Sequence, residues 1–497
     1  MLVRQTLFTG ATNFAGAESL FWGRSRMLKN FLGAYSAWAA SWLRRPWLLI
    51  GAGVLFCYAI VLIVPHFLPV KGPMSRTFNS MLDHLLQGRF DVDPEIVGKE
   101  GFPREGRVYA YWGPVPAILR LPVTVLPSWR TLNFTLPYCA VALLWMGAVK
   151  LWTLRFVLRN HPAVPRSLAR AMYFVIALSG AQTSFFRFSL YQEVCLWAGL
   201  FSAVFVAAAI VAQHRSLGER ERLVMALAAG AALLTRVSTG IGLIGAFALL
   251  LSVEAVSERA DWRGQLRKSL LPTLMLMAAI FVAGVVNYGR WGNPVTFADY
   301  HHYIYNSEYP DRVVRTATYG LFNIARIPFG IIYYFLPVWV LHDGQGHLLF
   351  EATRFRLIDS AELPPSSFFL TDPVLFLLGG LSLMRWFGRR GPGARQGGAV
   401  AMGLAIPPLL MLTAISMCFR YRMDFYPLIE FLAFSGLAMI GQSSPLARPR
   451  LIWTLTAISV ISSVAVSIAY VAGSLGPGQL LIGRGVGRFY LSRLGVH

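Results

Sequence analysis

Long apolar runs, separated by short segments rich in arginine, dominate the pattern of this chain. Residues 47 to 67 contain no Asp, Glu, Lys or Arg, and a helix of about 20 apolar residues crosses the ~30 Å hydrocarbon core of a bilayer. The pattern therefore predicts an all-α, polytopic membrane protein. We expect the clear spans at residues 47–68, 131–152, 169–188, 194–212, 269–288, 371–386, 399–418, 427–442 and 452–473.

Two further apolar regions are interrupted. In residues 223–254 the sequence LLTRVSTG places Arg236 in the middle of the run, and a single span would bury this cation at a cost of at least ~2.5 kcal/mol. We therefore predict two short helices that meet at Arg236. Residues 317–338 contain an arginine and two prolines, and here we predict a re-entrant or interfacial segment that does not cross the membrane.

The basic residues predict the orientation, because Lys and Arg are enriched in cytoplasmic loops. The segments that flank the Arg236 region are basic and are expected on the cytoplasmic side: Arg215, Arg220, Arg222, Arg259, Arg263, Arg267 and Lys268. This assignment predicts eleven crossings, with the N-terminus inside and the C-terminus outside. It places most acidic residues on the outer face, which is where we expect the chemistry: Asp83, Asp91, Asp93, Glu95, Glu193, Asp299, Asp343, Asp359 and Asp424.

The composition agrees with this picture and narrows it. Of the 497 residues, 56% are hydrophobic and 14% are charged, whereas soluble proteins carry about 25% charged residues. We expect one membrane domain (residues 47–473), a cytoplasmic N-terminal segment with an amphipathic interfacial helix (1–46) and a C-terminal tail (474–497). Within the membrane domain, a second large outer region is expected at residues 289–370. The net charge of +22 lies in the loops, so the expected partners include membrane lipids and exclude nucleic acid.

The first outer loop, expected at residues 69–130, holds most of the candidate chemistry. It begins with a predicted amphipathic helix, whose polar face should lie in the membrane interface and point into a cleft: Arg76, Asn79, Asp83 and Gln87. Gly88 is expected to end this helix. The loop continues with Asp91 and Asp93, then with Arg107, Tyr109 and Tyr111, and finally with the proline-broken sequence GPVPAILRLP.

Several pieces of the sequence resemble those of membrane glycosyltransferases with the GT-C fold, including bacterial members. DHLLQGRF and VYAYWGPVPAILRLP are similar to pieces of the family's first outer loop. LYQEVCLWAG resembles a segment between the third and fourth spans, and LLTRVSTGIGL resembles a helix pair broken at an arginine. NYGRWGNPVTFADY and FRYRMDFYPLI are similar to later pieces, and the set covers residues 47 to 445 in the family's order.

The resemblance implies a GT-C-like bundle that acts at the periplasmic side of the bacterial inner membrane. It also implies transfer of a sugar, with inversion, from a polyprenyl-phosphate-linked donor to a lipid, glycan or protein acceptor. A carboxylate of the first outer loop would be the general base. Well-studied members place an acidic residue directly after the first span, whereas Lys71 to Ser80 contains none. Asp83 is therefore the first candidate, with Asp91 and Asp93 as alternatives.

The leaving group of this reaction is a phosphate, for which arginine is a suitable partner because it donates two hydrogen bonds at once. The candidates are Arg107, Arg420 and Arg422. The other expected substrate-binding residues are Arg76, Tyr109, Tyr111, Glu193, Arg236, Asp299 and Asp424. The piece DVDPE also offers carboxylates to a divalent cation, although no metal site is assigned.

Structural interpretations compete with these roles. Asp83 can simply belong to the polar face of a helix, Asp91 and Asp93 to a solvated turn, and Glu193 to a helix N-terminus. Arg236 can be a cap between two half-helices, and Arg420, Arg422 and Asp424 a salt bridge at the membrane surface. His301 and His302 are expected to be surface residues or to pack at an interface.

A polytopic transporter or lipid flippase is the alternative function, with a scaffold role behind it. Transporters are expected to carry ionisable residues near the middle of the membrane and an internal repeat. The sequence shows neither, since the acidic residues cluster outside and the first outer loop has no counterpart in the second half.

Overall fold

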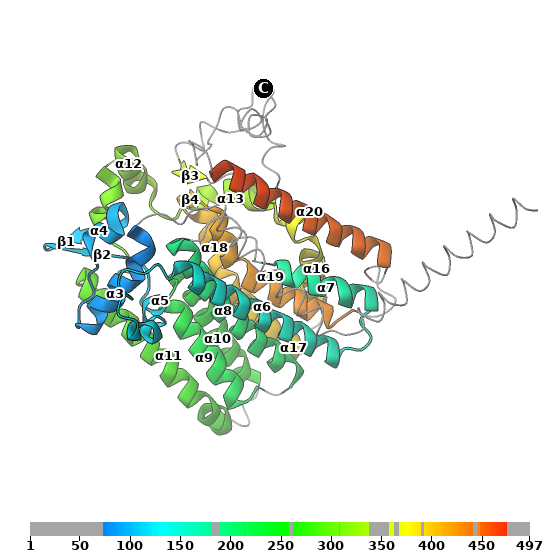
Figure 1. The fold of residues 1–497 in the computed structure, drawn as a ribbon. Helices are drawn as coiled ribbons and strands as arrows, with labels where there is room; N and C mark the ends of the chain where they lie inside the picture. The colour runs from blue at the N-terminus through cyan, green and yellow to red at the C-terminus, as the bar shows by residue number, and fades with distance from the viewer. Residues whose placement is uncertain are drawn as a thin grey trace, which may run out of the picture. The chain divides into compact units, whose positions relative to one another are not determined.

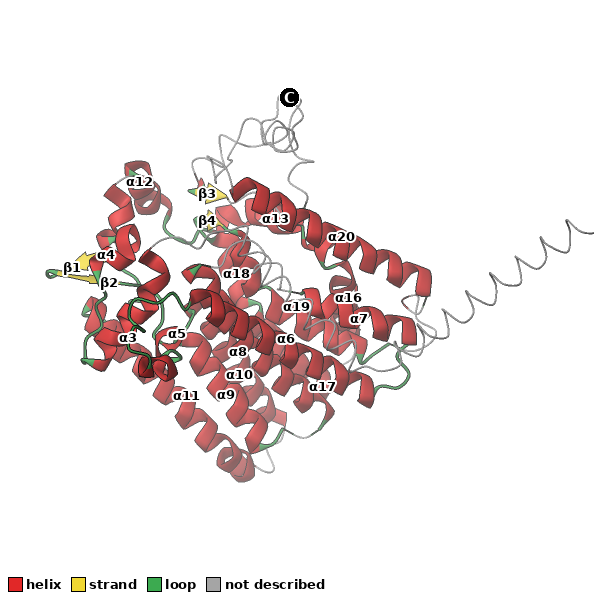
Figure 2. Cartoon of the chain, viewed as in Figure 1, coloured by secondary structure: helices red, strands yellow, loops and turns green. Residues whose placement is uncertain are grey.

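The computed structural model describes residues 73–179, 189–215, 217–257, 262–307, 309–336, 357–361, 367–388, 392–440, 446 and 448–474. Figures 1 and 2 show that most of these residues are helical. The helices of ten or more residues are α3 (Thr77–Leu86), α6 (Thr135–Asn160), α7 (Arg166–Leu178), α8 (Leu190–His214), α9 (Glu219–Leu233), α10 (Val237–Ser257), α11 (Trp262–Trp291), α12 (Pro310–Tyr319), α16 (Pro373–Gly388), α17 (Pro392–Leu404), α19 (Tyr426–Leu437) and α20 (Pro449–Ser474).

Shorter elements connect these helices. The short α-helices are α4 (Pro94–Val97), α5 (Val115–Ile118), α13 (Ile327–Phe335), α15 (Phe368–Thr371) and α18 (Ile406–Thr413). The 3-10 helices are η1 (Pro73–Arg76), η2 (Gly98–Glu100), η3 (Leu121–Val125), η6 (Tyr300–His302), η7 (Ile304–Ser307), η8 (Ile324–Arg326) and η10 (Phe419–Asp424). Strand β1 (Phe102–Arg104) pairs with β2 (Arg107–Tyr109) in antiparallel fashion, and β3 (Ser360–Ala361) pairs with β4 (Ser416–Met417) in parallel.

Helices of membrane-spanning length confirm the prediction of a helical, multi-pass membrane protein. Among the described residues, five stretches are long and apolar enough to cross a bilayer: Thr135–Asn160, Leu190–His214, Val237–Val256, Arg263–Trp291 and Gly393–Thr413. The total of eleven crossings stays a prediction. The expected first span, the N-terminal interfacial helix and the tail from residue 475 onward lie outside the described residues.

The two interrupted regions adopt broken structure. The predicted break is confirmed, since α9 ends at Leu233 and α10 begins at Val237, with Arg236 between them. Helix α10, however, has 21 residues and is not the short helix that the sequence predicted. In the second region, η8 and α13 form a short helical segment. Helix α13 has nine residues, which at a rise of ~1.5 Å per residue is about half the thickness of the hydrocarbon core.

Helix α8 is the most buried of the long apolar helices. In its most apolar stretch 83% of the residues are buried, against 22% in α11. Its sequence is apolar on every face, which is the pattern of a helix surrounded by protein. Helix α11 instead exposes large side chains, among them Phe281 at 71%. Helix α8 therefore lies inside the packed helices, and α11 lies at their periphery.

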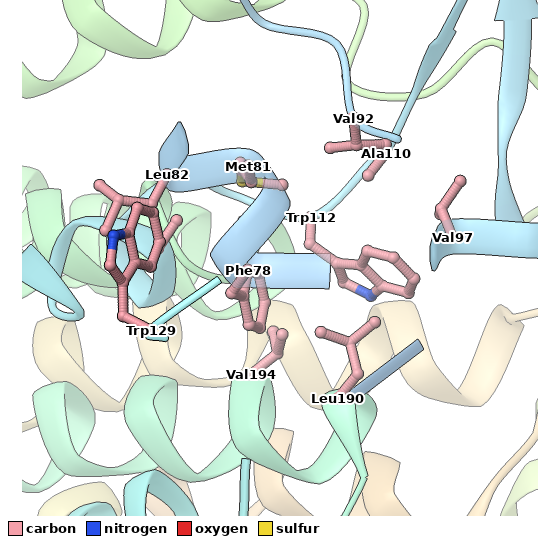
Figure 3. Packing of buried hydrophobic residues seen from close by; sticks show 11 residues of the cluster. Phe78, Met81, Leu82, Val92, Val97, Ala110, Trp112, Trp129, Leu190 and Val194 are labelled. Carbon is pink, nitrogen blue, oxygen red and sulfur yellow. The ribbon is translucent and has the colours of Figure 1, made fainter. Parts of the chain in front are cut away.

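The first loop (residues 73–134) folds around a hydrophobic core of its own, which rests on the start of α8. Figure 3 shows this cluster, in which Phe78 and Trp112 of the loop meet Leu190 and Val194 of α8. The loop also contains the hairpin of β1 and β2. Glu105 and Gly106 at its turn have φ angles of 52° and 74°, which gives the tight turn that a two-residue hairpin requires.

Helix α3 differs from the expected interfacial helix in where its polar face points. It ends at Leu86, and Gly88, which was predicted to stop it, follows two residues later with a φ of 72° that turns the chain away. Asn79, however, is 1% exposed, and its Nδ2 donates hydrogen bonds of 2.8 Å to the carbonyls of Trp129 and Leu132. The end of the first loop therefore covers this face of α3. Its backbone carbonyls supply the hydrogen-bond partners that a buried polar side chain requires.

The second loop (residues 292–336) packs against the first. Phe102 and Tyr109 of the first loop share a hydrophobic cluster with Trp291 and Tyr303. The backbone N–H of Ile304 donates to the carbonyl of Gly101 at 3.1 Å. These contacts bring two segments that are about 200 residues apart in sequence to one end of the helices.

Candidate functional site

A carboxylate of the first loop, Glu100, lies where the two loops meet. It ends η2, two residues after Gly98, whose φ of 56° allows the chain to turn sharply. The hydroxyl of Tyr303 in the second loop donates a hydrogen bond of 2.8 Å to Oε2 of Glu100. Tyr191, at the start of α8, lies close enough to this carboxylate for its charge to act on the phenol. Glu100 thus joins the two loops beside the start of α8.

Aromatic packing holds this arrangement in place. Phe102, two residues after Glu100, is fully buried and stacks on the ring of Tyr303 with centroids 4.8 Å apart. Tyr300 meets both rings edge to face, at 5.7 and 5.6 Å. Such aromatic pairs contribute about 0.5–1.5 kcal/mol each beyond area burial, so the tyrosine that binds Glu100 is firmly positioned.

Two arginines border the same group of residues. The guanidinium of Arg312 lies 5.2 Å from the ring centroid of Tyr303, and its Nε is 3.3 Å from Oδ2 of Asp359. The guanidinium of Arg420, in η10, lies 4.6 Å from the ring centroid of Tyr191. We refer to the following set as the Glu100 cluster: Glu100, Tyr191, Tyr300, Tyr303, Arg312 and Arg420.

The tyrosines around Glu100 act as hydrogen-bond donors at neutral pH. Burial, reinforced by the charge of Glu100, raises the pKa of Tyr303 and of Tyr111 far above the usual tyrosine range. Burial also raises the pKa of Tyr300, although Arg312 opposes the shift. A protonated phenol donates to a carboxylate, so the cluster presents an oriented, partly exposed carboxylate beside two cations.

The break between α9 and α10 is fixed by an ion pair to η10. Arg236 donates from Nε to both carboxylate oxygens of Asp424 at 3.1 Å and from Nη2 to Oδ2 at 2.6 Å. Ser238 and Thr239 also donate to Asp424, which is fully buried. The two predicted binding residues thus bind each other. Arg236 also lies over the ring of Tyr421, which follows Arg420.

Glu193 takes part in a second buried ion pair, at the base of the first loop. Its Oε2 accepts a hydrogen bond of 2.7 Å from Nη2 of Arg120, and neither side chain is exposed. Nη1 of Arg120 donates to Oδ1 of Asn79 at 2.6 Å. The three side chains link α3 and the end of α5 to α8, so Glu193 holds the first loop in place.

Arg422 is also buried and paired. Its Nη2 donates to Oδ2 of Asp372 at 2.9 Å and to the hydroxyl of Thr371 at 2.6 Å, and Tyr426 donates to the same carboxylate. Its guanidinium lies 3.7 Å from the ring centroid of Phe368. The neighbouring arginines of η10 therefore differ, because Arg422 is 1% exposed whereas Arg420 is partly exposed.

Asp91 and Asp93 flank an imidazole. Nδ1 of His84 lies 3.2 Å from Oδ2 of Asp91, and its Nε2 lies 3.3 Å from Oδ1 of Asp93. Ser80 donates to Asp93 at 2.7 Å, and Arg89 donates to Asp91 at 3.0 Å. The side chain of Asp91 is 9% exposed and that of Asp93 is 47% exposed. This network ties the chain after Gly88 back onto α3.

Asp83 points elsewhere. Its Oδ1 accepts a hydrogen bond of 2.9 Å from Nη2 of Arg130, whose side chain is 61% exposed. Asp83 and His84 are adjacent on α3, and adjacent helical residues do not face each other. Of the three aspartates predicted as candidates for the base, Asp91 and Asp93 therefore share His84, whereas Asp83 lies in a different ion pair.

The other predicted binding residues lie around the two loops. Arg107 is exposed in β2, whereas Tyr109 is buried against Trp291. Tyr111 is partly buried, lies close to Trp112 and is near enough to Glu100 for its charge to act on the phenol. Arg76 is partly exposed at the start of α3. Asp299 caps η6 by accepting the N–H of His301 at 3.1 Å.

The sequence did not single out Glu100, Tyr303 or Arg312. One feature of the sequence could have indicated Glu100. It lies between Gly98 and Gly101, in the same loop as the predicted aspartates. Tyr303 and Arg312 gave none, because their role depends on contacts with a loop about 200 residues earlier in the chain.

Among the described residues, no group of three or more His, Cys, Asp or Glu side chains is placed to hold a metal ion. His84, Asp91 and Asp93 do not form such a group either.

No family model and no curated protein matches this sequence. Similar solved structures are those of the archaeal oligosaccharyltransferase AglB from Archaeoglobus fulgidus. The structure with an inhibitory peptide and a dolichol-phosphate has a TM-score of 0.46 at 12% identity over 92% of this chain and 60% of that chain. The apo form has a TM-score of 0.45 at 13% identity over the same shares. The complex with Zn and sulfate has a TM-score of 0.41 at 14% identity, over 84% and 52%.

The chain thus spans about three fifths of the length of the solved protein that it resembles. That protein is of the class that the sequence pieces resemble.

Proposed function

We propose that this chain is a membrane glycosyltransferase that transfers a sugar from a polyprenyl-phosphate-linked donor to a lipid, glycan or protein acceptor. The observation that carries the proposal is the Glu100 cluster. It gathers a partly exposed carboxylate and two guanidinium groups from three separate segments beside the start of the apolar helix α8. A general base beside cations suits a reaction in which an acceptor is deprotonated and a phosphorylated lipid is the leaving group.

In the proposed reaction, an acceptor hydroxyl attacks the anomeric carbon of the donor sugar. A new bond forms between the acceptor oxygen and that carbon, while the bond from the carbon to the phosphate oxygen breaks. The electron pair leaves with the polyprenyl phosphate, and the acceptor proton passes to Glu100. Attack opposite the leaving group inverts the anomeric configuration, and a positioned general base contributes about 10²- to 10⁴-fold to the rate.

Glu100 is favoured over the three aspartates because of its neighbours. Asp83 is paired with Arg130 at an exposed position, and Asp91 is largely buried beside His84. Asp93 accepts from Ser80 and lies beside the same imidazole. Glu100 receives neutral phenol donors, which orient a carboxylate without cancelling its charge.

Arg420 is the proposed partner of the donor phosphate, with Arg312 beside it. A guanidinium donates two hydrogen bonds to phosphate oxygens in one plane, which stabilises the charge that develops on the leaving group. Arg422 is less suited because it is buried against Asp372. Arg107 is less suited because it lies on the exposed hairpin.

The proposed topology is the eleven-crossing GT-C-like arrangement in the bacterial inner membrane, with both loops on the periplasmic side. The basic segments near Arg215 and Arg263 support it, because such residues remain in the cytoplasm. In this orientation the donor lipid reaches the Glu100 cluster from the outer leaflet.

One observation favours a transporter as the second candidate. Lys150 of α6 and Glu430 of α19 form a buried ion pair within two apolar helices, and Ser179 donates to the same carboxylate. Ionisable residues inside a membrane often mark an ion or substrate pathway. The sequence pattern predicted no ionisable residues near the middle of the membrane, and this pair departs from that prediction.

The test uses the purified full-length chain in proteoliposomes with radiolabelled polyprenyl-phosphate sugars and an acceptor mixture from the cell envelope. We expect labelled product with an inverted anomeric configuration and loss of product in Arg420→Ala. Arg107→Ala, on the exposed hairpin, is the matched control and should keep its activity. Uptake of substrate into the vesicles without any transfer would instead support the transporter and refute the glycosyltransferase.

A further inference from the structure

A row of tyrosine rings leads from Glu100 to the surface of the second loop. The ring of Tyr303, which binds Glu100, stacks on that of Tyr305 with centroids 5.9 Å apart and planes inclined by 22°. Tyr305 stacks in turn on Tyr309, at 4.8 Å and 16°. Exposure rises along the row, from 7% for Tyr303 to 44% for Tyr309.

The rings are held rigidly at the inner end of the row. Phe102 stacks on the inner face of Tyr303, and the guanidinium of Arg312 lies 5.2 Å from the centroid of the same ring. The backbone N–H of Arg312 donates to the carbonyl of Tyr309 at 3.0 Å, which ties the outer end of the row to α12. A rigid aromatic surface binds a ligand at a low cost in conformational entropy.

We infer that this row, Tyr303, Tyr305 and Tyr309, is a binding subsite for a carbohydrate acceptor. The inference rests on the proposed function and names the class of acceptor as a glycan. The faces of Tyr303 and Tyr305 are covered by their stacked neighbours, so the exposed ring of Tyr309 is the one that offers a face. A sugar ring has an apolar face of C–H bonds with partial positive charge, which packs on such an aromatic face. Its hydroxyl groups bind phenol groups, which both donate and accept hydrogen bonds.

The position of the row supports a saccharide acceptor. Its inner end is hydrogen-bonded to the proposed base, and its outer end is exposed, so a saccharide that packs on Tyr309 and extends past the ring edges of the row would bring a terminal hydroxyl to Glu100. Tyrosines that merely anchor a protein in lipid headgroups belong to a belt around the membrane interface. Here the rings instead stack on one another and end at a carboxylate.

The experiment measures saccharide binding without donor. The full-length chain carrying Glu100→Gln is placed in nanodiscs and mixed with each of maltose, mannobiose and galactobiose, and binding is followed by saturation-transfer NMR. We expect at least one disaccharide to bind. Tyr309→Ala should weaken it by about three- to tenfold, whereas Tyr309→Phe, which keeps the ring, should weaken it by less. Tyr288→Ala, which removes an exposed tyrosine of α11, is the control and should bind normally.

Three results would overturn the subsite: no disaccharide binds, Tyr309→Ala binds as well as the parent, or a Ser/Thr-rich peptide binds in place of the sugars. Equal melting temperatures of the alanine and phenylalanine variants exclude a folding defect. Because no donor is present, this experiment does not depend on transfer. Binding at Tyr309 without any transfer activity would refute only the proposed function, whereas transfer that is insensitive to Tyr309 would refute only the subsite.

Discussion

The buried ion pair between Arg120 and Glu193 gives a quantitative prediction about how the first loop is held. Both side chains are fully buried, and the distance between Nη2 and Oε2 is 2.7 Å. In Arg120→Met, the Glu193 carboxylate keeps its burial but loses its counter-charge, and Oδ1 of Asn79 loses its donor. Breaking a buried pair from one side costs about 3–5 kcal/mol.

This cost should appear as local opening of the first loop, because the pair joins the loop to α8. A loss of about 3–5 kcal/mol raises the opening equilibrium by about 10²- to 10⁴-fold. We expect this as faster amide hydrogen exchange, measured by mass spectrometry in peptides from residues 76–133. The double variant Arg120→Met/Glu193→Leu removes both charges, and most of the protection should return.

The matched control is Arg222→Met, which breaks another buried pair, to Glu254 at 3.0 Å between α9 and α10. It should destabilise the protein without a specific loss of protection in the first loop. Unchanged exchange of the first loop in Arg120→Met would refute the reasoning. So would a double variant that is as unprotected as the single one, because the cost would then not come from an unpaired charge.

Three further predictions concern the break between α9 and α10, the contact of the first loop with it and the acid stability. Asp424→Asn removes the counter-charge of Arg236, so the stability in detergent should fall by about 3–5 kcal/mol; an unchanged denaturation midpoint would contradict this. In Gly113→Ala the new Cβ would lie 2.0 Å from the backbone oxygen of Leu234 in the α9–α10 break. We therefore expect the free energy of unfolding to fall by about 1–3 kcal/mol. Gly147→Ala, with open space around it, should stabilise α6 by about 0.5–1 kcal/mol, and equal melting shifts in the two variants would refute the steric argument. Burial and a neighbouring histidine lower the pKa of His161, so the unfolded chain takes up a proton near pH ~6.5 that the folded chain binds only at lower pH. Stability should therefore fall on acidification below about pH 6.5, and it should fall less in His161→Gln. The measurement compares the melting temperatures of both proteins at about pH 7.5 and 5.5. An equal decrease in both would exclude His161 as the cause.

The sequence predicted those parts of the fold that depend on local pattern. Apolar runs of membrane-spanning length identified α6, α8 and α11, because helix length and hydropathy are properties of a continuous segment. Arg236 marked the break between α9 and α10 for a similar reason, since a cation in the middle of an apolar run is costly.

The candidate site was harder to predict because it depends on contacts between distant segments. Arg236 and Asp424 were both singled out, but nothing in their 188-residue separation indicates that they pair. Glu193 was expected at a helix N-terminus, and its buried partner Arg120 lies in a segment that has no regular pattern. Glu100 becomes a candidate only when Tyr303 is placed against it.

The interpretation of α3 shows the same limit. Its polar face was predicted from helical spacing, and that spacing is present. Spacing cannot indicate that residues 129–132 return to cover Asn79 with two backbone carbonyls. A polar stripe was therefore expected to face a cleft, although part of it satisfies the backbone of its own loop.

The role of Glu100 as the general base is the central claim, and the turnover of Glu100→Gln tests it most directly. This variant keeps the shape of the side chain and removes its basicity. The rate of sugar transfer at saturating donor and acceptor should fall by about 10²- to 10⁴-fold, while Asp83→Asn, whose carboxylate is paired with Arg130, should turn over at a rate close to that of the parent. Parent-like turnover in Glu100→Gln, together with loss of activity in Asp91→Asn or Asp93→Asn, would contradict the claim and place the base beside His84.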